Sequence, residues 1–364
     1  MSRKSDTKTD TKTDFKADDM GYLSGGLFGL PIAPTEAKLH LIPVPWEVTT
    51  SYGRGASRGP AAILRASRQI DLFDLETGNA WKSGFHMDAI DREWVDQNRQ
   101  LKEMALERLE LLESGEDDST SSIRMVTAIN EASAELNRWV EQQALEKLRA
   151  GKLVGVIGGD HSTPFGLIKA LHDHRKADFG ILHIDAHADL RSAYQGYTDS
   201  HASIMFNVME RLKLPKLVQV GIRDFSEAEF DYARGRKETI STFYDRTLKR
   251  RLENGESWKS IAAAIVEELP AKVYVSFDID GLEPSLCPHT GTPVPGGLSF
   301  DHACSLLAAI ADAGKSIVGF DLNEVAEPEE GEAEWDANVG ARLLYKLCGW
   351  TAVTNGAADR GARV

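Results

Sequence analysis

The sequence has few cysteines and no long apolar run. Its three cysteines, Cys287, Cys304 and Cys348, are far apart and odd in number. That pattern argues against a disulfide framework and a thiolate zinc site, and it favours a reducing compartment. No apolar run reaches the roughly 18 residues that a membrane-spanning helix needs, and the first residues have no apolar signal core. We therefore expect a cytoplasmic protein without a membrane partner.

Positive charge is also scarce. The chain has 42 lysines and arginines against 56 aspartates and glutamates, which gives a net charge of −14. Nucleic acid and anionic membranes would be repelled by this balance, whereas a small cationic substrate would be attracted. With 42% apolar residues in a chain of 364, there is enough material for a large buried core.

The N-terminus differs in composition from the rest of the chain. Residues 1–20 repeat the sequence DTKT and contain almost no apolar side chains. Such a segment cannot bury enough surface to order itself, so we predict a disordered tail there. No domain break is visible after residue 38, and we predict a single domain over residues 21–364.

Strand-like and helical patterns alternate through the chain. An apolar run at 38–45 predicts a first strand, and two helical patterns at 94–112 and 123–148 follow, for which we expect core packing only. Further strand-like runs lie at 153–157, 180–185, 217–221, 273–278 and 316–321. Helical patterns separate them at 165–174, 203–212, 258–269 and 301–313. This repetition predicts an α/β fold, a three-layer α/β/α sandwich around a mainly parallel sheet.

Three of the strand-like runs end in residues that bind hard metal ions. LVGVIGGDHS (153–162), FGILHIDAHAD (179–189) and KVYVSFDID (272–280) each place aspartate or histidine after an apolar stretch. An extended backbone turns residues at two-residue spacing to one side, and the carboxyl ends of parallel strands share one crevice. The candidate ligands are His161, Asp185, His187, Asp189, Asp278 and Asp280.

These residue types indicate a pair of metal ions. Two imidazoles and four carboxylates are too many for one zinc ion, and oxygen-rich sites suit ions such as Mn²⁺. Two divalent ions would neutralise four aspartates, and a water shared between them would supply hydroxide at neutral pH. A cationic electrophile such as a guanidinium would suit this site. For His183, inside the strand, we expect core packing, with support of Asp185 as the alternative.

The motifs resemble a known family. GGDHS (158–162), DAHAD (185–189) and SFDIDGLEPS (276–285) are similar, in order and separation, to the three signature motifs of the ureohydrolases. That family includes arginase, agmatinase, guanidinobutyrase, formimidoylglutamase and guanidine hydrolase, and the resemblance runs from Leu39 to Trp350. It implies an arginase-like fold, hydrolysis of a guanidino C–N bond with release of urea, two Mn²⁺ or Ni²⁺ ions per subunit, and homo-oligomers, either trimers or hexamers.

The resemblance also implies a role for each site residue. One ion would be held by His161, Asp185, Asp189 and Asp278, and the other by Asp185, His187, Asp278 and Asp280. Asp189 would in addition accept a hydrogen bond from the bridging hydroxide and pass its proton to the leaving amine. His201 matches the family's proton shuttle, and Glu324 matches the glutamate that receives the guanidinium group. Their alternatives are a helix-start residue for His201 and an exposed loop carboxylate for Glu324.

The identity of the substrate depends on the loops around the site. DLRSAYQGYTDSHAS (189–203) resembles agmatinase-like members and lacks the pattern by which arginases hold an α-amino acid. The extended N-terminus and EWDANVGARLLY, which follows the acidic segment after Glu324, resemble the branch that contains the guanidine hydrolases, for which nickel is the implied metal. We therefore expect agmatine-like compounds or free guanidine. One alternative is a formimidoylglutamase or other ω-guanidino acid hydrolase, in which Arg191 would bind the substrate carboxylate. Two others are a metal-dependent deacetylase of acetylated amines on a related fold and a catalytically silent scaffold.

Overall fold

One eight-stranded sheet organises the computed structural model, which describes residues 25–50, 52–116, 118–328 and 334–362. The strand order is β2-β1-β3-β8-β7-β4-β5-β6, and every pairing in this sheet is parallel. The strands are β1 (Leu39–Pro43), β2 (Phe85–Met87), β3 (Leu153–Ile157), β4 (Gly180–Ile184), β5 (Leu217–Val220), β6 (Ile240–Phe243), β7 (Lys272–Asp278) and β8 (Ser316–Asn323). The predicted tail at 1–20 lies outside the described residues.

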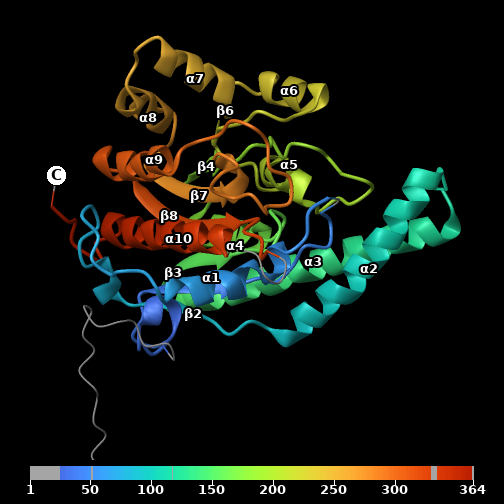
Figure 1. The fold of residues 1–364 in the computed structure, drawn as a ribbon, viewed down its shortest axis with the longest axis horizontal. Coiled ribbons are helices and arrows are strands. Elements are labelled where there is room, and N and C mark those ends of the chain that lie inside the picture. Colours follow the sequence, from blue (N-terminus) through green and yellow to red (C-terminus); the bar gives the residue numbers. More distant parts are fainter. Residues whose placement is uncertain (1–24, 51, 117, 329–333, 363–364) are drawn as a thin grey trace, which may run out of the picture.

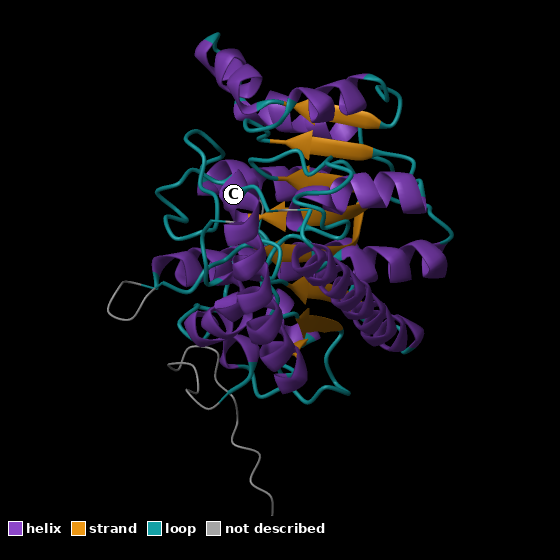
Figure 2. Ribbon diagram, turned by 90° about the vertical axis from the view of Figure 1, so that its right-hand side faces the viewer, coloured by secondary structure: helices purple, strands orange, loops and turns teal. Residues whose placement is uncertain are grey.

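Helices cover both faces of the sheet (Figures 1 and 2). One apolar core lies under α1 (Gly59–Ser67), α7 (Asp245–Glu253), α8 (Trp258–Glu267), α9 (Phe300–Asp312) and α10 (Trp335–Thr354). The other lies under α2 (Arg92–Ser114), α3 (Thr120–Arg149), α4 (Phe165–Arg175), α5 (Ile204–Asn207) and α6 (Glu227–Arg234). Along β4, Ile181 faces the second core and Leu182 the first, as strand alternation requires. The predicted three-layer α/β/α sandwich with a parallel sheet is confirmed.

Six short helices complete the described elements and lie mainly in the loops. They are η1 (Leu27–Gly29), η2 (Ala56–Arg58), η3 (Ala80–Ser83), η4 (His201–Ser203), η5 (Val208–Leu212) and η6 (Ile279–Gly281). The single helix predicted over 203–212 is in fact α5 followed by the π-helical η5. The remaining predicted helices and strands begin and end within three residues of the expected positions, and the largest difference is at the start of α3.

The two strands that the sequence patterns missed are the edges of the sheet. β2 has only three residues, and β6 contains Ser241 and Thr242, so neither shows an apolar run. Edge strands are commonly short or polar, since an exposed apolar edge would pair with other chains. Within the described residues, no helix is long and apolar enough to cross a membrane. The predicted single domain over 21–364 remains a prediction.

Candidate active site

The strand order brings the predicted site segments together. β3, β8, β7 and β4 are neighbours in the sheet, so the loops at their carboxyl ends adjoin. His161 follows β3, Asp185 to Asp189 follow β4, Asp278 ends β7 and Glu324 follows β8. Because parallel strands end at the same edge, residues that are up to 163 positions apart in sequence come into contact.

His161 lies at the centre of a first group of carboxylates. Its Nδ1 atom is 3.0 Å from Asp185 Oδ2, 3.4 Å from Asp189 Oδ2 and 3.2 Å from Asp278 Oδ2. The four side chains are all almost fully buried. The structure therefore brings together the four residues that the resemblance assigned to one metal ion.

A second group lies around His187 and shares Asp185 with the first. His187 Nδ1 is 3.1 Å from Asp280 Oδ2 and 3.6 Å from Asp185 Oδ1. Asp280 is buried, whereas His187 is half-buried and lines a cavity. All six predicted ligands thus lie in two adjoining groups. The bridging role expected for Asp278 remains a prediction.

Turns at the ends of the strands orient the side chains of the candidate ligands. The prediction that an extended backbone turns them to one side is therefore wrong. β4 ends at Ile184, and the next residues turn so that the amide of His187 donates to Asp185 Oδ1 at 2.6 Å. Asp189 has a positive φ of 54°. After β7, the amide of Asp280 donates to Asp278 Oδ1 at 2.9 Å. Asp185, just after β4, and Asp278, at the end of β7, thus each accept a hydrogen bond from the backbone amide two residues later, which bends the loop back toward the site.

The two glycines of the GGDHS motif allow the loop after β3 to fit between its neighbours. A Cβ atom on Gly159 would lie 1.8 Å from the carbonyl oxygen of Trp46, and one on Gly158 would lie 1.9 Å from Asn323 Oδ1. No side chain fits at such distances. Glycine is therefore required at both positions if His161 is to reach the carboxylates.

The donor set fits a pair of divalent cations. Among the described residues, no lysine or arginine forms an ion pair with Asp185, Asp189, Asp278 or Asp280. Burial first, and then the neighbouring carboxylates, raise the pKa of Asp189 and of Asp278 well above the usual value. Ligand atoms that share an ion at about 2.1 Å lie roughly 3.0–3.4 Å apart. The separations between His161 and its carboxylates match that range, and cations would relieve the repulsion.

Two residues that the sequence analysis did not single out orient His161. Its Nε2 atom is 2.9 Å from Ser276 Oγ, and that hydroxyl donates to Asp321 Oδ1 at 3.0 Å. With Nε2 engaged in this way, Nδ1 is the nitrogen that faces the carboxylates. Ser276 and Asp321 are polar residues within otherwise apolar strands, and this pattern was the signal available in the sequence.

His183 supports Asp185, so core packing alone is the wrong interpretation. It is fully buried in β4, and its Nε2 atom is 2.8 Å from Asp185 Oδ2. On the other side of the ring, the Gln219 amide nitrogen is 3.1 Å from Nδ1 and acts as the donor. The proton of His183 must then be on Nε2, where it is donated to Asp185. The alternative role, support of a ligand, is the one that the structure favours.

Glu324 is buried, which contradicts the exposed-loop alternative. Its side chain is 6% exposed, and Oε1 accepts a hydrogen bond from the amide of His161 at 3.1 Å. Oε2 has no hydrogen-bond partner among the described residues. Burial, followed by the charges of Asp278 and Asp160, raises the pKa of Glu324 well above its usual value. A buried carboxylate oxygen without a donor is a place where a cationic ligand would be stabilised.

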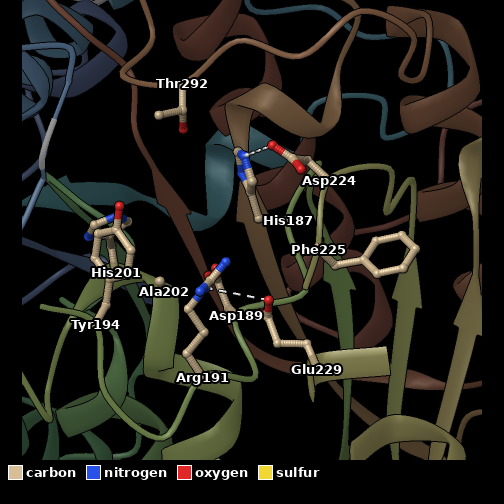
Figure 3. A pocket seen from close by; sticks show the side chains of 10 residues that line it. All are labelled: His187, Asp189, Arg191, Tyr194, His201, Ala202, Asp224, Phe225, Glu229 and Thr292. Carbon is tan, nitrogen blue, oxygen red and sulfur yellow. Dashed lines mark ion pairs between the residues drawn. The ribbon is translucent and has the colours of Figure 1, made fainter. Parts of the chain in front are cut away.

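His201 is the first residue of η4 and lines the cavity in Figure 3. The helix-start alternative therefore describes its backbone position correctly, and its predicted chemical role remains a prediction. Burial, together with the positive charges of His187 and Lys102, lowers its pKa to about 3, so the imidazole is neutral at pH 7. The ring packs edge-on against Tyr194, with centroids 5.6 Å apart.

The cavity beside the site has a volume of about 170 Å³. Figure 3 shows His201 and Tyr194 on one side, Phe225 and Glu229 on the other, and His187 with Asp224 between them.

Arg191 also lines the cavity, and its Nε atom is 3.4 Å from Glu229 Oε2. The guanidinium is thus already paired, which weakens the alternative in which it binds a substrate carboxylate. Most of the acidic segment after Glu324, residues 329–333, lies outside the described residues.

Comparisons with known proteins identify the family of this chain. The model of the arginase family matches residues 37–349. An N(1)-aminopropylagmatine ureohydrolase of Thermus thermophilus is 34% identical over 339 residues, 92% of this chain and 97% of the relative. One of Synechocystis is 30% identical over 86% and 89% of the two chains. The crystal structure of agmatine ureohydrolase of Thermoplasma volcanium has the same fold, with a TM-score of 0.66, 24% identity, and coverage of 88% and 92%. The family resemblance is confirmed, and this chain belongs to the arginase family.

Proposed function

We propose that this protein hydrolyses the guanidino C–N bond of a small cationic ω-guanidino amine, such as agmatine or its aminopropyl derivative, and releases urea. The observation that carries this proposal is the buried Glu324 carboxylate. Its Oε1 accepts a hydrogen bond from the amide of His161, one of the candidate ligands, and its Oε2 has no partner among the described residues. We propose that a planar guanidinium bound to Glu324 presents its carbon to the cluster of carboxylates and histidines around His161. This arrangement supports attack on the guanidinium carbon.

Two divalent ions fit the six ligands. We propose that His161, Asp185, Asp189 and Asp278 hold one ion, and that Asp185, His187, Asp278 and Asp280 hold the other. Such a pair of ions supplies a hydroxide at neutral pH and stabilises the charge that develops during attack. The oxygen-rich ligand set supports Mn²⁺, with Ni²⁺ as the alternative.

Three side chains have separate roles in the proposed reaction. Glu324 binds and orients the guanidinium, so that its carbon is presented to the cluster. Asp189, which is 4% exposed, holds a proton in the site and delivers it to the leaving amine. His201 lies at the cavity wall, where it passes a second proton from the solvent to the product amine.

The wall of the cavity supports an amine as the rest of the substrate. Asp224 lines it, together with the aromatic rings of Tyr194 and Phe225. Asp224 is exposed, and its Oδ2 atom is 3.9 Å from His187 Nε2. Carboxylates and aromatic faces both attract ammonium groups. Relatives named for agmatine and aminopropylagmatine support the same class of substrate.

The test is a urea-release assay on protein reconstituted separately with Mn²⁺ and Ni²⁺. The substrates are N(1)-aminopropylagmatine, agmatine, 4-guanidinobutyrate, L-arginine and free guanidine. We expect the two amines to have the highest kcat/KM and two metal ions to be found per subunit. Highest kcat/KM for 4-guanidinobutyrate would favour the ω-guanidino acid alternative, and highest kcat/KM for guanidine would favour the guanidine hydrolase branch. Release of urea from none of them would exclude the proposed function.

Family membership supports a proposal for assembly and location. We propose a cytoplasmic homo-oligomer, a trimer or a hexamer. Mass photometry at nanomolar concentration distinguishes these two states from a monomer, which would contradict the proposal.

A further inference from the structure

We propose that Thr49 is a positioning residue, whose hydroxyl joins His201 to the buried carboxylate of Asp160 and so sets the orientation and tautomer of the imidazole. The chemical importance of this contact depends on the proposed function, in which His201 moves a proton. Its structural part, the tautomer, can be tested independently of any substrate.

Thr49 Oγ1 has three polar neighbours. It is 3.2 Å from Asp160 Oδ2 and 3.1 Å from His201 Nδ1, and it accepts a hydrogen bond from the His201 amide at 3.2 Å. Thr49 is 1% exposed and Asp160 is fully buried, so water cannot easily replace these contacts. The three residues come from distant segments of the chain, since Thr49 is 111 positions from Asp160 and 152 from His201. Only the folded sheet brings them together.

A count of donors and acceptors assigns the protons. Asp160 Oδ1 accepts from the amide of Ser162 at 3.0 Å and from its hydroxyl at 2.5 Å, so this carboxylate acts as an acceptor. The single Thr49 O–H therefore donates to Asp160 Oδ2. One lone pair of Oγ1 accepts from the His201 amide, and the other accepts from Nδ1–H of the ring. The imidazole then carries its proton on Nδ1, and the lone pair of Nε2 is the one available to the cavity.

The loop that carries Thr49 is itself held by α2. Lys102 Nζ donates to the carbonyl oxygen of Glu47 at 3.0 Å and to that of Thr50 at 2.6 Å. The amide of Glu47 donates to Asn98 Oδ1 at 2.7 Å. These hydrogen bonds hold Glu47 before Thr49 and Thr50 after it. The position of its hydroxyl is therefore set by the helix and not by the loop alone.

A matched pair of variants tests the role of the hydroxyl. Thr49→Val keeps the shape of the side chain and removes the hydroxyl, whereas Thr49→Ser keeps the hydroxyl. In the metal-loaded enzyme we expect Thr49→Val to lower kcat about 10- to 100-fold, the usual range for loss of an orienting partner, with KM and metal content nearly unchanged. Thr49→Ser should recover most of kcat. Equal kcat values for the valine variant and the wild type would overturn the proposal, as would a serine variant no better than valine.

A double-mutant cycle separates this role from general support of the fold. If Thr49 acts through His201, Thr49→Val has no further effect on kcat in the His201→Ala background. Fully additive losses would mean that Thr49 acts on something else.

The tautomer is tested without substrate, by NMR of protein labelled with ¹⁵N-histidine. The signals of His201 are assigned by their loss in His201→Ala. We expect protonated Nδ1 in the wild type and an increased Nε2-protonated population in Thr49→Val. Protonation on Nε2 in the wild type would refute the assignment. Because this readout needs no turnover, failure of the urea assay on the wild type counts against the proposed function alone.

Discussion

At the scale of single residues, the site contains backbone strain. Asp189 and Glu324 have positive φ angles of 54° and 60°, a region that side chains other than glycine seldom adopt. Such a conformation costs about 1–3 kcal/mol, and surrounding bonds must hold it. The carbonyl of Asp189 accepts from the amide of Met205 at 3.1 Å, and that of Glu324 accepts from Thr290 Oγ1 at 2.8 Å. The strain lies at two residues to which we assign chemical roles.

Glu324→Gln is the first test at this scale. The substitution keeps the size of the side chain and removes the charge that would pair with a guanidinium. We expect kcat/KM for agmatine or aminopropylagmatine to fall about 10- to 150-fold, because a hydrogen bond to a charged group contributes about 1.5–3 kcal/mol. Steady-state urea release measures this change. Glu253→Gln, at an exposed position in α7, is the control and should match the wild type. An unchanged kcat/KM in Glu324→Gln would mean that another group binds the guanidinium.

At the scale of elements, α2 does more than pack against the core. We expected only core packing from the helical patterns at 94–112 and 123–148. α2 packs Trp94 edge-on against Trp46, with ring centroids 5.9 Å apart, and it also anchors the loop after β1 through Asn98 and Lys102. Lys102 is 8% exposed, and burial lowers its pKa. A lysine in a helical pattern usually predicts a solvated face, which is why sequence alone did not reveal this anchor.

Replacing Lys102 tests this role of α2. Lys102→Met keeps most of the side chain's length and leaves the carbonyls of Glu47 and Thr50 without their donor. We expect kcat to fall about tenfold, as for other losses of an orienting partner, and the free energy of unfolding to fall by about 1–3 kcal/mol.

Arg99→Met is the matched control for Lys102→Met. Its side chain is on the same helix and is 68% exposed, so both quantities should stay near the wild-type values. Thermal unfolding is the appropriate stability assay, since guanidinium and urea resemble the substrate and the product. If Arg99→Met and Lys102→Met behaved alike, the anchor would have no special role.

At the scale of the whole molecule, an ion-pair network joins segments that are far apart in the chain. Lys346 in α10 is 2.6 Å from Asp74 Oδ2 and 2.8 Å from Glu76 Oε2. Asp74 Oδ1 also accepts from the amides of Glu76 and Thr77, at 3.0 and 2.8 Å. The loop between α1 and β2 is thereby attached to the last helix, some 270 residues later.

This network predicts how stability depends on pH. Burial raises the pKa of Asp74, but bonds from Lys346 and Thr77 outweigh it and hold the pKa below the usual value. A carboxyl with a lowered pKa stabilises the fold at pH values above its unfolded-state pKa of about 4, and this contribution disappears as pH falls through the lower folded-state pKa. We expect Asp74→Asn to destabilise the protein by about 1–2 kcal/mol at pH 7. This loss of stability should become smaller as the pH is lowered below 4.

Thermal unfolding of the Asp74→Asn variant and the wild type between pH 7 and pH 3 measures that difference. Asp96→Asn, with a side chain 62% exposed, serves as the control. A difference between Asp74→Asn and the wild type that stays constant down to pH 3 would show that the charge of Asp74 does not contribute.

The sequence by itself determined the fold class and the family of this arginase-family protein, and it predicted the six candidate ligands that the fold brings into two adjoining groups. That was possible because each candidate ligand lies next to an apolar run, so a local pattern shows both the strand and the residue after it. Only the tertiary structure decided how the ligands are aimed, since turns after Ile184 and at Asp278 replace strand alternation. It also decided which distant residues support them. Ser276 with Asp321, and Thr49 with His201, are 45 and 152 positions apart, and no local pattern records such contacts, because sheet order alone brings those loops together.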